Sequence, residues 1–269
     1  SIVRQAAGSP LITLAHAIRE LAENAQRVRL DLLRPYAEGA AQIVDGNLQT
    51  VTEYVADAIS SGFRAVGITY RNEDVDRINA GAHRALYPSS TLPYEPGERV
   101  LFRAPWHRPG EENREPVVRT NEMGTVVSLS DVVESPFDLP MRNLTVELDS
   151  GREYMFPVPV NPVTWRRAVS ALFAEHRAAK ANAAIAKGTE ADSIREVARA
   201  ASAHAWRLRS WFAAVQHAYA LTAHRSQGST YDIAVLHWRG LGMMRDDFEH
   251  ARAVYVAATR ASQFLVIVE

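Results

Sequence analysis

The densest group of hydrogen-bonding side chains in the sequence lies in the segment 219–232, YALTAHRSQGSTYD. An apolar run leads into Thr222 and another follows Asp232, as expected for two buried strands. Ligands of open α/β sheets bind at the carboxyl ends of strands, so the polar side chains between the runs are binding candidates: Thr222, His224, Arg225, Ser226, Gln227 and Thr230. Gly228 would let backbone N–H groups approach a phosphate or sugar closely. A polar turn that only caps the next element is the alternative interpretation.

A second candidate is Arg260, in the segment 254–268, VYVAATRASQFLVIV. The pattern places it near the end of a helix, just before a buried strand. An arginine in this position can simply complement the helix dipole. It can also offer its guanidinium to a transferring phosphoryl group, as arginine fingers do. Arg4 and Gln5, ahead of the first helix, carry no signal on their own.

The elements that must position these residues alternate between helix and strand near both ends of the sequence, which favours a layered α/β domain. Helices are predicted over 10–34, 51–62, 72–87 and 248–262, with Asn72 as an N-cap. Buried strands are predicted over 63–70, 218–222, 233–238 and 264–269.

The middle of the sequence has a different character. Prolines and short β-type runs fill 88–162, with a tight hairpin turn at 149–151, which indicates a small antiparallel barrel. Residues 164–217 are alanine-rich and predict an antiparallel helical pair broken at Gly188. Its tryptophans, Trp165, Trp206 and Trp211, occupy apolar helical positions and are expected in the core rather than as stacking platforms.

Composition sets further limits. The 269 residues are 47% hydrophobic and 23% charged, with a formal net charge of −1, so no global basic field points to nucleic acid. The absence of cysteine excludes disulfides, thiolate metal sites and cysteine nucleophiles. Neither a signal peptide nor an apolar run long enough to span a membrane is visible, so a cytoplasmic location is expected.

Four segments resemble, in order, the motifs of superfamily 1 helicases in their RecD/Dda-like form, superfamily 1B. VRQAAGSPLITLAHAIRE resembles motif IV with its following helix, and GITYRNEDVDRIN resembles the accessory motif after it. LTAHRSQGSTYD resembles motif V, and VYVAATRA resembles motif VI. The β-rich region lies where this family carries an SH3-like barrel, called domain 2B.

The resemblance implies a RecA-like, P-loop-NTPase-type parallel sheet flanked by helices, interrupted by an SH3-like barrel and a helical pair. The implied boundaries are 1–92 for the first part of the RecA-like domain, 93–161 for the barrel, and 162–269 for the helical pair with the second part. No GxxxxGK[ST] phosphate loop occurs in the sequence. The chain therefore resembles the C-terminal half of a motor whose first RecA-like domain would hold that loop.

Site residues follow from the same resemblance. Arg4 and Arg260 would contact the γ-phosphate of ATP. Other implied nucleotide contacts are Gln5, Gln227, Gly228, Ser229 and Thr230. The implied contacts with single-stranded DNA are Tyr70, Arg71, Asn72, Thr222, Ala223 and His224. ATP and Mg²⁺ would be held mainly by the N-terminal RecA-like domain, which is the expected partner, and no metal site is expected in this chain.

The implied function is the C-terminal motor half of an ATP-dependent 5′→3′ DNA helicase, inactive as an ATPase on its own. Two alternatives stay open. One is a non-catalytic nucleic-acid-binding module that keeps the RecA-like fold, and the other is a relative that acts on RNA.

Overall fold

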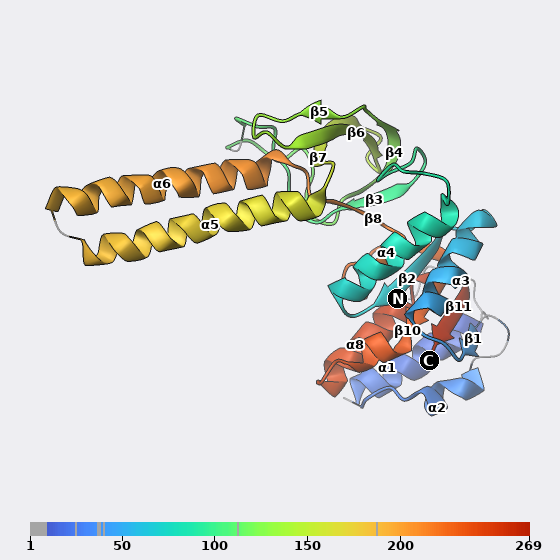
Figure 1. Cartoon of the computed structure of the whole chain (residues 1–269). Helices are drawn as coiled ribbons and strands as arrows, with labels where there is room; N and C mark the ends of the chain where they lie inside the picture. Colours follow the sequence, from blue (N-terminus) through green and yellow to red (C-terminus); the bar gives the residue numbers. More distant parts are fainter. Residues whose placement is uncertain (1–9, 25, 37–38, 40, 112, 187) are drawn as a thin grey trace. The chain divides into compact units, whose positions relative to one another are not determined.

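A five-stranded parallel sheet carries the candidate residues in the computed structural model, which describes residues 10–24, 26–36, 39, 41–111, 113–186 and 188–269 (Figure 1). The chain divides into two compact units. Unit 1 comprises Ser1–Thr91 and His217–Glu269, and unit 2 comprises Leu92–Gln216.

The sheet of unit 1 has the strand order β1-β11-β10-β2-β9. Its strands are β1 (Ala41–Val44), β2 (Ala65–Thr69), β9 (Ala220–Thr222), β10 (Tyr231–His237) and β11 (Ala261–Val268). Every neighbouring pair is parallel. All five residues of β2 are buried, as expected for a central strand covered by helices on both faces.

Helices cover both faces of this sheet. The helices α3 (Leu48–Ser60) and α4 (Asn72–Leu86) lie on one face, against β2, β9 and β10. The other face is covered by α1 (Pro10–Glu23), α7 (Trp238–Gly242) and α8 (Asp247–Ala258). Helix α3 begins with a capping box, in which the Asn47 side chain accepts from Gln49 N and Thr50 Oγ1 accepts from Asn47 N.

The outer edge of β9 is covered by one side chain of α4. Asn79 Oδ1 accepts from Ala220 N at 2.8 Å, and Asn79 Nδ2 donates to Ala220 O at 3.4 Å. Asn79 is buried, with 4% of its surface exposed. Its amide therefore satisfies the two backbone groups that a further strand would otherwise pair with.

Unit 2 contains a six-stranded sheet whose main path runs β5-β6-β4-β3-β8, with β7 paired to β6. Its strands are β3 (Arg99–Phe102), β4 (Met123–Leu129), β5 (Val133–Glu134), β6 (Pro140–Leu148), β7 (Glu153–Pro159) and β8 (Val215–His217), whose last residue is the first of the second stretch of unit 1. Phe102, Trp106 and Phe156 are central to its core, with the rings of Phe102 and Phe156 4.6 Å apart. The predicted hairpin turn closes through Leu148 N to Arg152 O at 2.8 Å, with Gly151 at φ 78°.

The helices α5 (Pro162–Ile185) and α6 (Gly188–Trp211) form an antiparallel hairpin in unit 2 (Figure 1). Asn161 caps α5 by accepting from Val163 N and Thr164 N. Trp165 Nε1 donates to Leu208 O at 3.3 Å across the pair. The expectation that all three tryptophans of this pair are core residues is wrong for Trp206, which is 53% exposed.

The predicted α/β class is confirmed: a parallel sheet flanked by helices is interrupted in sequence by an antiparallel β region and a helical pair. Asn72 is the first residue of α4 rather than its N-cap, which is Arg71 without a side-chain cap bond. No helix among the described residues is both long enough and apolar enough to cross a membrane.

The single helix predicted over 10–34 is in fact two, α1 and the short α2 (Leu30–Leu33), followed by a 3₁₀ turn, η1 (Arg34–Tyr36). The chain leaves the helical path because residues 27 and 28 are held by tertiary contacts. Arg27 Nη1 donates to Met244 O at 2.9 Å, and Val28 is buried.

Candidate functional site

The segment that resembles motif V runs from the carboxyl ends of the strands of unit 1 to their amino ends. These two sides of the sheet are called its carboxyl edge and its amino edge. Thr222 ends β9 and pairs with Thr69, the last residue of β2, at the carboxyl edge. Tyr231 begins β10 and pairs with Ala261, the first residue of β11, at the amino edge. Because β9 and β10 run in the same direction, the residues between them must travel the length of a strand.

The candidate residues consequently fall into two groups at opposite edges of the sheet. The expectation from composition, that all of them follow the carboxyl end of a strand, holds for Thr222 and its neighbours. It is wrong for Thr230, which directly precedes β10 at the amino edge.

The carboxyl-edge group joins the ends of β2 and β9. Ala223 N donates to Thr69 O at 3.0 Å, which holds the start of the segment beside the 70–72 loop. The side chains of Tyr70, Arg71, Asn72 and His224 are exposed, with Tyr70 at 45%. Arg71 Nη2 donates to Glu73 Oε2 at 2.6 Å. Ala223 is buried and can offer a ligand only backbone atoms.

A buried turn shapes the segment after Thr222. Ser226 N donates to Thr222 O at 3.0 Å, and Ser226 Oγ donates to Ala223 O at 2.8 Å. Ser226 is fully buried, so the structure gives it a positioning role rather than a ligand contact. His224 and Gln227, on the same turn, are exposed.

The amino-edge group surrounds Arg260, just after α8. Its guanidinium donates three hydrogen bonds: Nε to Val256 O at 2.8 Å, Nη1 to Ser229 O at 2.9 Å, and Nη2 to Thr259 Oγ1 at 3.0 Å. Arg260 is 9% exposed. Its own carbonyl accepts from Tyr231 N at 2.9 Å. One residue therefore joins the end of α8 to the end of the motif V-like segment.

Gly228 has a backbone conformation suited to an approaching ligand. Its φ of +98° is one that side-chain-bearing residues rarely adopt, and no atom lies within 4 Å of where a Cβ would stand. With Arg260 and the exposed Gln227, it fits an edge that contacts phosphate or ribose oxygens. The set 227–230 with Arg260 contains no carboxylate, so it does not fit as a Mg²⁺ site.

A buried polar network behind the carboxyl edge was not predicted. Thr69 Oγ1 lies 3.3 Å from His237 Nδ1 and 3.5 Å from Asp74 Oδ2. Burial lowers the pKa of His237, while Asp74 raises it and Arg239 lowers it further. A Cβ on Gly240 would clash with both Thr69 Oγ1 and His237 Nδ1, so glycine leaves the room that this contact needs. Only the pairing of β2 with β10 brings these residues together, which is why no sequence pattern indicated them.

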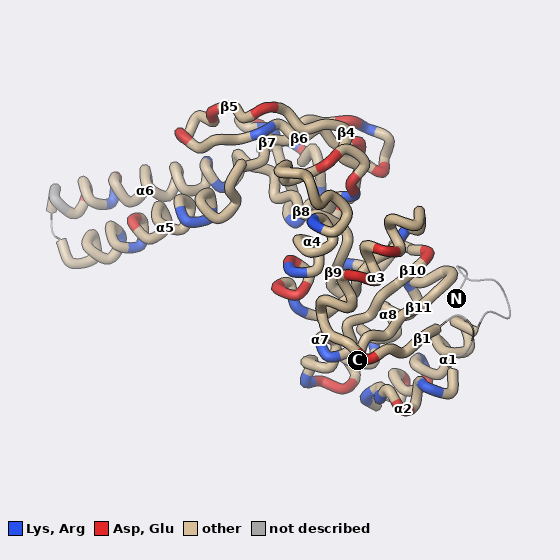
Figure 2. Tube along the Cα trace, turned by 45° about the vertical axis from the view of Figure 1, so that its right-hand side comes forward, with Lys and Arg blue, Asp and Glu red and all other residues tan. Residues whose placement is uncertain are grey.

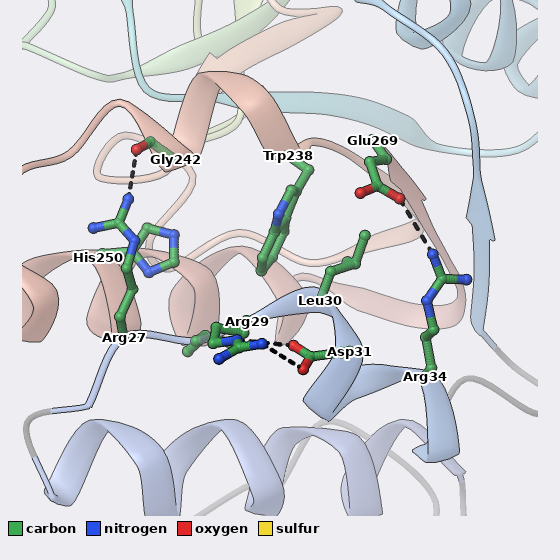
Figure 3. Close-up of a pocket in the computed structure, with 10 residues that line it drawn as sticks. Arg27, Arg29, Leu30, Asp31, Arg34, Trp238, Gly242, His250 and Glu269 are labelled. Atoms are coloured by element: carbon green, nitrogen blue, oxygen red, sulfur yellow. Dashed lines mark hydrogen bonds and ion pairs between the residues drawn. The ribbon is translucent and has the colours of Figure 1, made fainter.

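A hollow of ≈ 450 Å³ lies between the segment 27–34 and the residues that follow β10 and β11 (Figure 3). Its arginines are already engaged: Arg27 with Gly242 O, Arg29 with Asp31, and Arg34 with Glu269. In Figure 3 the ring of Trp238 lies between Arg27 and Arg34 and extends toward the part of the segment that carries Leu30. These contacts anchor the segment after α1, and they account for the break in the helix predicted over 10–34.

Arg4 and Gln5 lie outside the described residues. Of the two arginines predicted to reach the nucleotide, the structure thus places Arg260 alone.

Comparison with known proteins identifies the C-terminal segment. Residues 217–268 match the family model of the UvrD-like helicase C-terminal domain. This segment contains the motif V-like and motif VI-like sequences, and the match confirms their resemblance to a helicase. A search of curated proteins gave no significant match.

Similar solved structures include three structures of Pif1 helicases. One from Bacteroides, in complex with ADP-AlF3 and ssDNA, is 16% identical with a TM-score of 0.43 over 98% of this chain and 49% of its own. One from Candida albicans is 12% identical with a TM-score of 0.48 over 100% and 55%. A third, described at forked dsDNA, is 17% identical with a TM-score of 0.42 over 99% and 48%. The chain spans about half the length of these structures.

Proposed function

We propose that the chain is the second motor domain of an ATP-dependent, 5′→3′ superfamily 1B DNA helicase. In this proposal ATP lies between the amino edge of the unit 1 sheet and a first RecA-like domain that carries the P-loop. Single-stranded DNA lies along the carboxyl edge, on Tyr70, Arg71, Asn72, Thr222, Ala223 and His224.

One observation carries the proposal: the segment 222–231 joins the two edges. Its first residues are bonded to the end of β2 through Ala223 N and Thr69 O. Its last residues are bonded to Arg260 through Ser229 O, and Tyr231 N donates to the Arg260 carbonyl. A displacement of Arg260 on nucleotide binding would therefore pass through these hydrogen bonds and along the segment to the DNA-side residues, as a translocating motor requires.

The chemistry assigned to the amino edge is electrostatic. Arg260 and Arg4 would stabilise charge on the transferring phosphoryl group, because a guanidinium stays protonated and offers a planar fork of donors. Gln5, Gln227, Gly228, Ser229 and Thr230 would contact the rest of the nucleotide. Mg²⁺ would neutralise phosphate charge from the partner domain, where the acidic ligands and the P-loop belong.

A second candidate function has an observation of its own. Arg260 is nearly buried and donates to two backbone carbonyls, as a purely structural arginine at a helix end does. This favours a nucleic-acid-binding module that keeps the fold without ATP turnover.

Reconstitution separates the two candidates. The chain is mixed with the P-loop-bearing domain of its parent protein, and DNA-stimulated ATP hydrolysis is measured for wild type, Arg260→Ala and Arg252→Ala. Arg252 is the matched control, because it lies on α8, which ends two residues before Arg260, and is exposed in a pair with Glu249. A fall in ATP turnover of roughly 10³-fold or more in Arg260→Ala, with normal turnover in Arg252→Ala, supports the motor. Equal turnover in all three proteins would sink the motor assignment.

The DNA side is tested separately with the chain on its own. Thr222→Ala and His224→Ala should weaken binding to an oligo-dT strand at low salt, with the loss measured by fluorescence anisotropy. A parallel titration with oligo-U distinguishes DNA from RNA, since tighter binding to oligo-U would favour the RNA helicase relative.

A further inference from the structure

The two long helices of unit 2 carry the same pattern of side chains on one face each. In α5 the positions i, i+4, i+7, i+11 and i+14 are Arg166, Ser170, Phe173, Arg177 and Lys180. In α6 the same spacing gives Arg195, Arg199, Ser202, Trp206 and Arg209. Residues at this spacing lie along a single face of a helix. Each stripe therefore consists of basic, hydroxyl and aromatic side chains without a carboxylate.

Ring contacts join the two stripes into one surface. The rings of Phe173 and Trp206 meet edge to face across the hairpin, with centroids 5.4 Å apart and an interplanar angle of 83°. The Arg209 guanidinium carbon lies 5.1 Å from the centroid of Trp206. Trp206 is nevertheless 53% exposed, so one of the largest apolar side chains of the hairpin faces solvent. We name this combined face, the ten residues above, the hairpin stripe.

The basic residues of the hairpin stripe are mostly without acidic partners. Arg195 pairs with Asp192 at 2.7 Å. Within the described part of the chain, none of the others forms an ion pair with a carboxylate. Glu175 lies two residues from both Phe173 and Arg177, so it faces away from them. Figure 2 shows the Lys and Arg positions distributed along both helices.

We infer that the hairpin stripe binds single-stranded DNA. Guanidinium, ammonium and hydroxyl groups spaced along a helix face can contact successive phosphates without reading sequence. Exposed Trp206 offers a ring on which an unpaired base stacks, and Arg209 beside it adds a cation–π contribution. A purely solvated face accounts for the arginines but not for the exposed indole. Base stacking requires unpaired bases, which favours a single strand over a duplex.

This surface lies outside the site proposed on unit 1 and extends DNA binding to unit 2. It is tested on the whole chain by anisotropy titrations with a fluorescent oligo-dT strand at several salt concentrations. Two variants probe the charges and the ring: Arg177→Ala with Arg199→Ala, and Trp206→Ala. The charge control is Arg84→Ala with Arg152→Ala, two exposed arginines off the stripe that form no ion pair with any described residue. Trp206→Phe keeps an aromatic ring and controls for packing.

The charge variant should lower the slope of log K against log salt by about 1.4, which corresponds to two lost phosphate contacts on a single strand. Trp206→Ala should weaken binding roughly tenfold, with most of the loss restored by Trp206→Phe. Circular dichroism monitors hairpin helicity in each variant.

Two outcomes overturn the inference. In one, the stripe variants bind oligo-dT as tightly as the Arg84/Arg152 control while Thr222→Ala and His224→Ala lose binding, which leaves the proposed function intact. In the other, the stripe variants lose affinity equally for a duplex of the same length or for anionic phosphatidylserine vesicles, which would make the surface a general polyanion contact.

Discussion

Arg260 Nη1 donates a 2.9 Å hydrogen bond to the carbonyl of Ser229, thirty-one residues earlier in the chain. The same guanidinium also holds Val256 O, in the last turns of α8. The side chain thus has a structural task in addition to the catalytic one proposed for it. The two tasks can be separated, because they make different demands on the guanidinium.

Arg260→Ala should lower the free energy of unfolding of unit 1 by about 2 kcal/mol, since it leaves buried carbonyls without their donor. Arg260→Lys keeps the charge but loses the fork, so it should recover part of the stability and little of the ATP turnover in the reconstituted motor. Hydrogen exchange of β10 and β11 peptides measures the stability. A lysine variant with full turnover would contradict the role given to the planar fork.

Gly228→Ala should destabilise the chain by about 1 kcal/mol, because a φ of +98° strains any residue that has a Cβ. No atom crowds the position, so the effect is conformational and not steric. Gly242→Ala is the matched control, since that glycine also has open space and lacks a positive φ. Thermal unfolding compares the two variants, and equal midpoints would refute the strain argument.

Asn79→Ala should cost about 2 kcal/mol, because it removes both bonds to Ala220 and leaves buried backbone groups unsatisfied. Asn79→Asp keeps the acceptor for Ala220 N but places a carboxylate against Ala220 O, and should be at least as damaging. Faster exchange of the Ala220 and Leu221 amides than of those in β2 would locate the effect at the edge strand. An unchanged exchange pattern would argue against this bracing role.

His250 gives unit 1 a pH-dependent stability. Burial, with a smaller contribution from Arg27, lowers its pKa to about 4, while Asp247 acts in the opposite direction. The His250 imidazole therefore takes up a proton near pH 6.5 in the unfolded chain, but only near pH 4 in the folded chain. Stability from the neutral imidazole is complete above about pH 6.5 and falls toward pH 4, by at most about 1.4 kcal/mol per pH unit. Denaturant unfolding of His250→Gln should show a shallower loss over this window than wild type, and an identical profile would rule the residue out.

Much of the sheet of unit 1 was predictable because its strands are short apolar runs bounded by turn residues. The strand 63–70 and the helix after it agree with β2 and α4 to within two residues at each end. Helical periodicity in 10–34 was misleading, since the contacts of Arg27 with Met244 O and Gly242 O override the local preference for helix. The strand β1 was not predicted, because it is only four residues long and is an edge strand of the sheet.

The candidate site could likewise be predicted in part. Residue types and order indicated Thr222, His224 and Arg260, but spacing alone could not separate the two edges of the sheet. That separation follows from the parallel pairing of β9 with β2 and of β10 with β2, which is non-local information. The Thr69–His237 contact depends on the same pairing, and so does the requirement for glycine at 240.

Unit 2 is a continuous stretch of chain, whereas unit 1 is built from two stretches separated by the whole of Leu92–Gln216. During synthesis the first stretch can supply only β1 and β2, which are not neighbours in the finished sheet. The central strand β10 between β2 and β11 is made last but one, so the parallel sheet cannot close until unit 2 has left the ribosome. Unit 2 is therefore expected to fold first, and the exposed face of β2 is the part of the nascent chain most in need of chaperone protection.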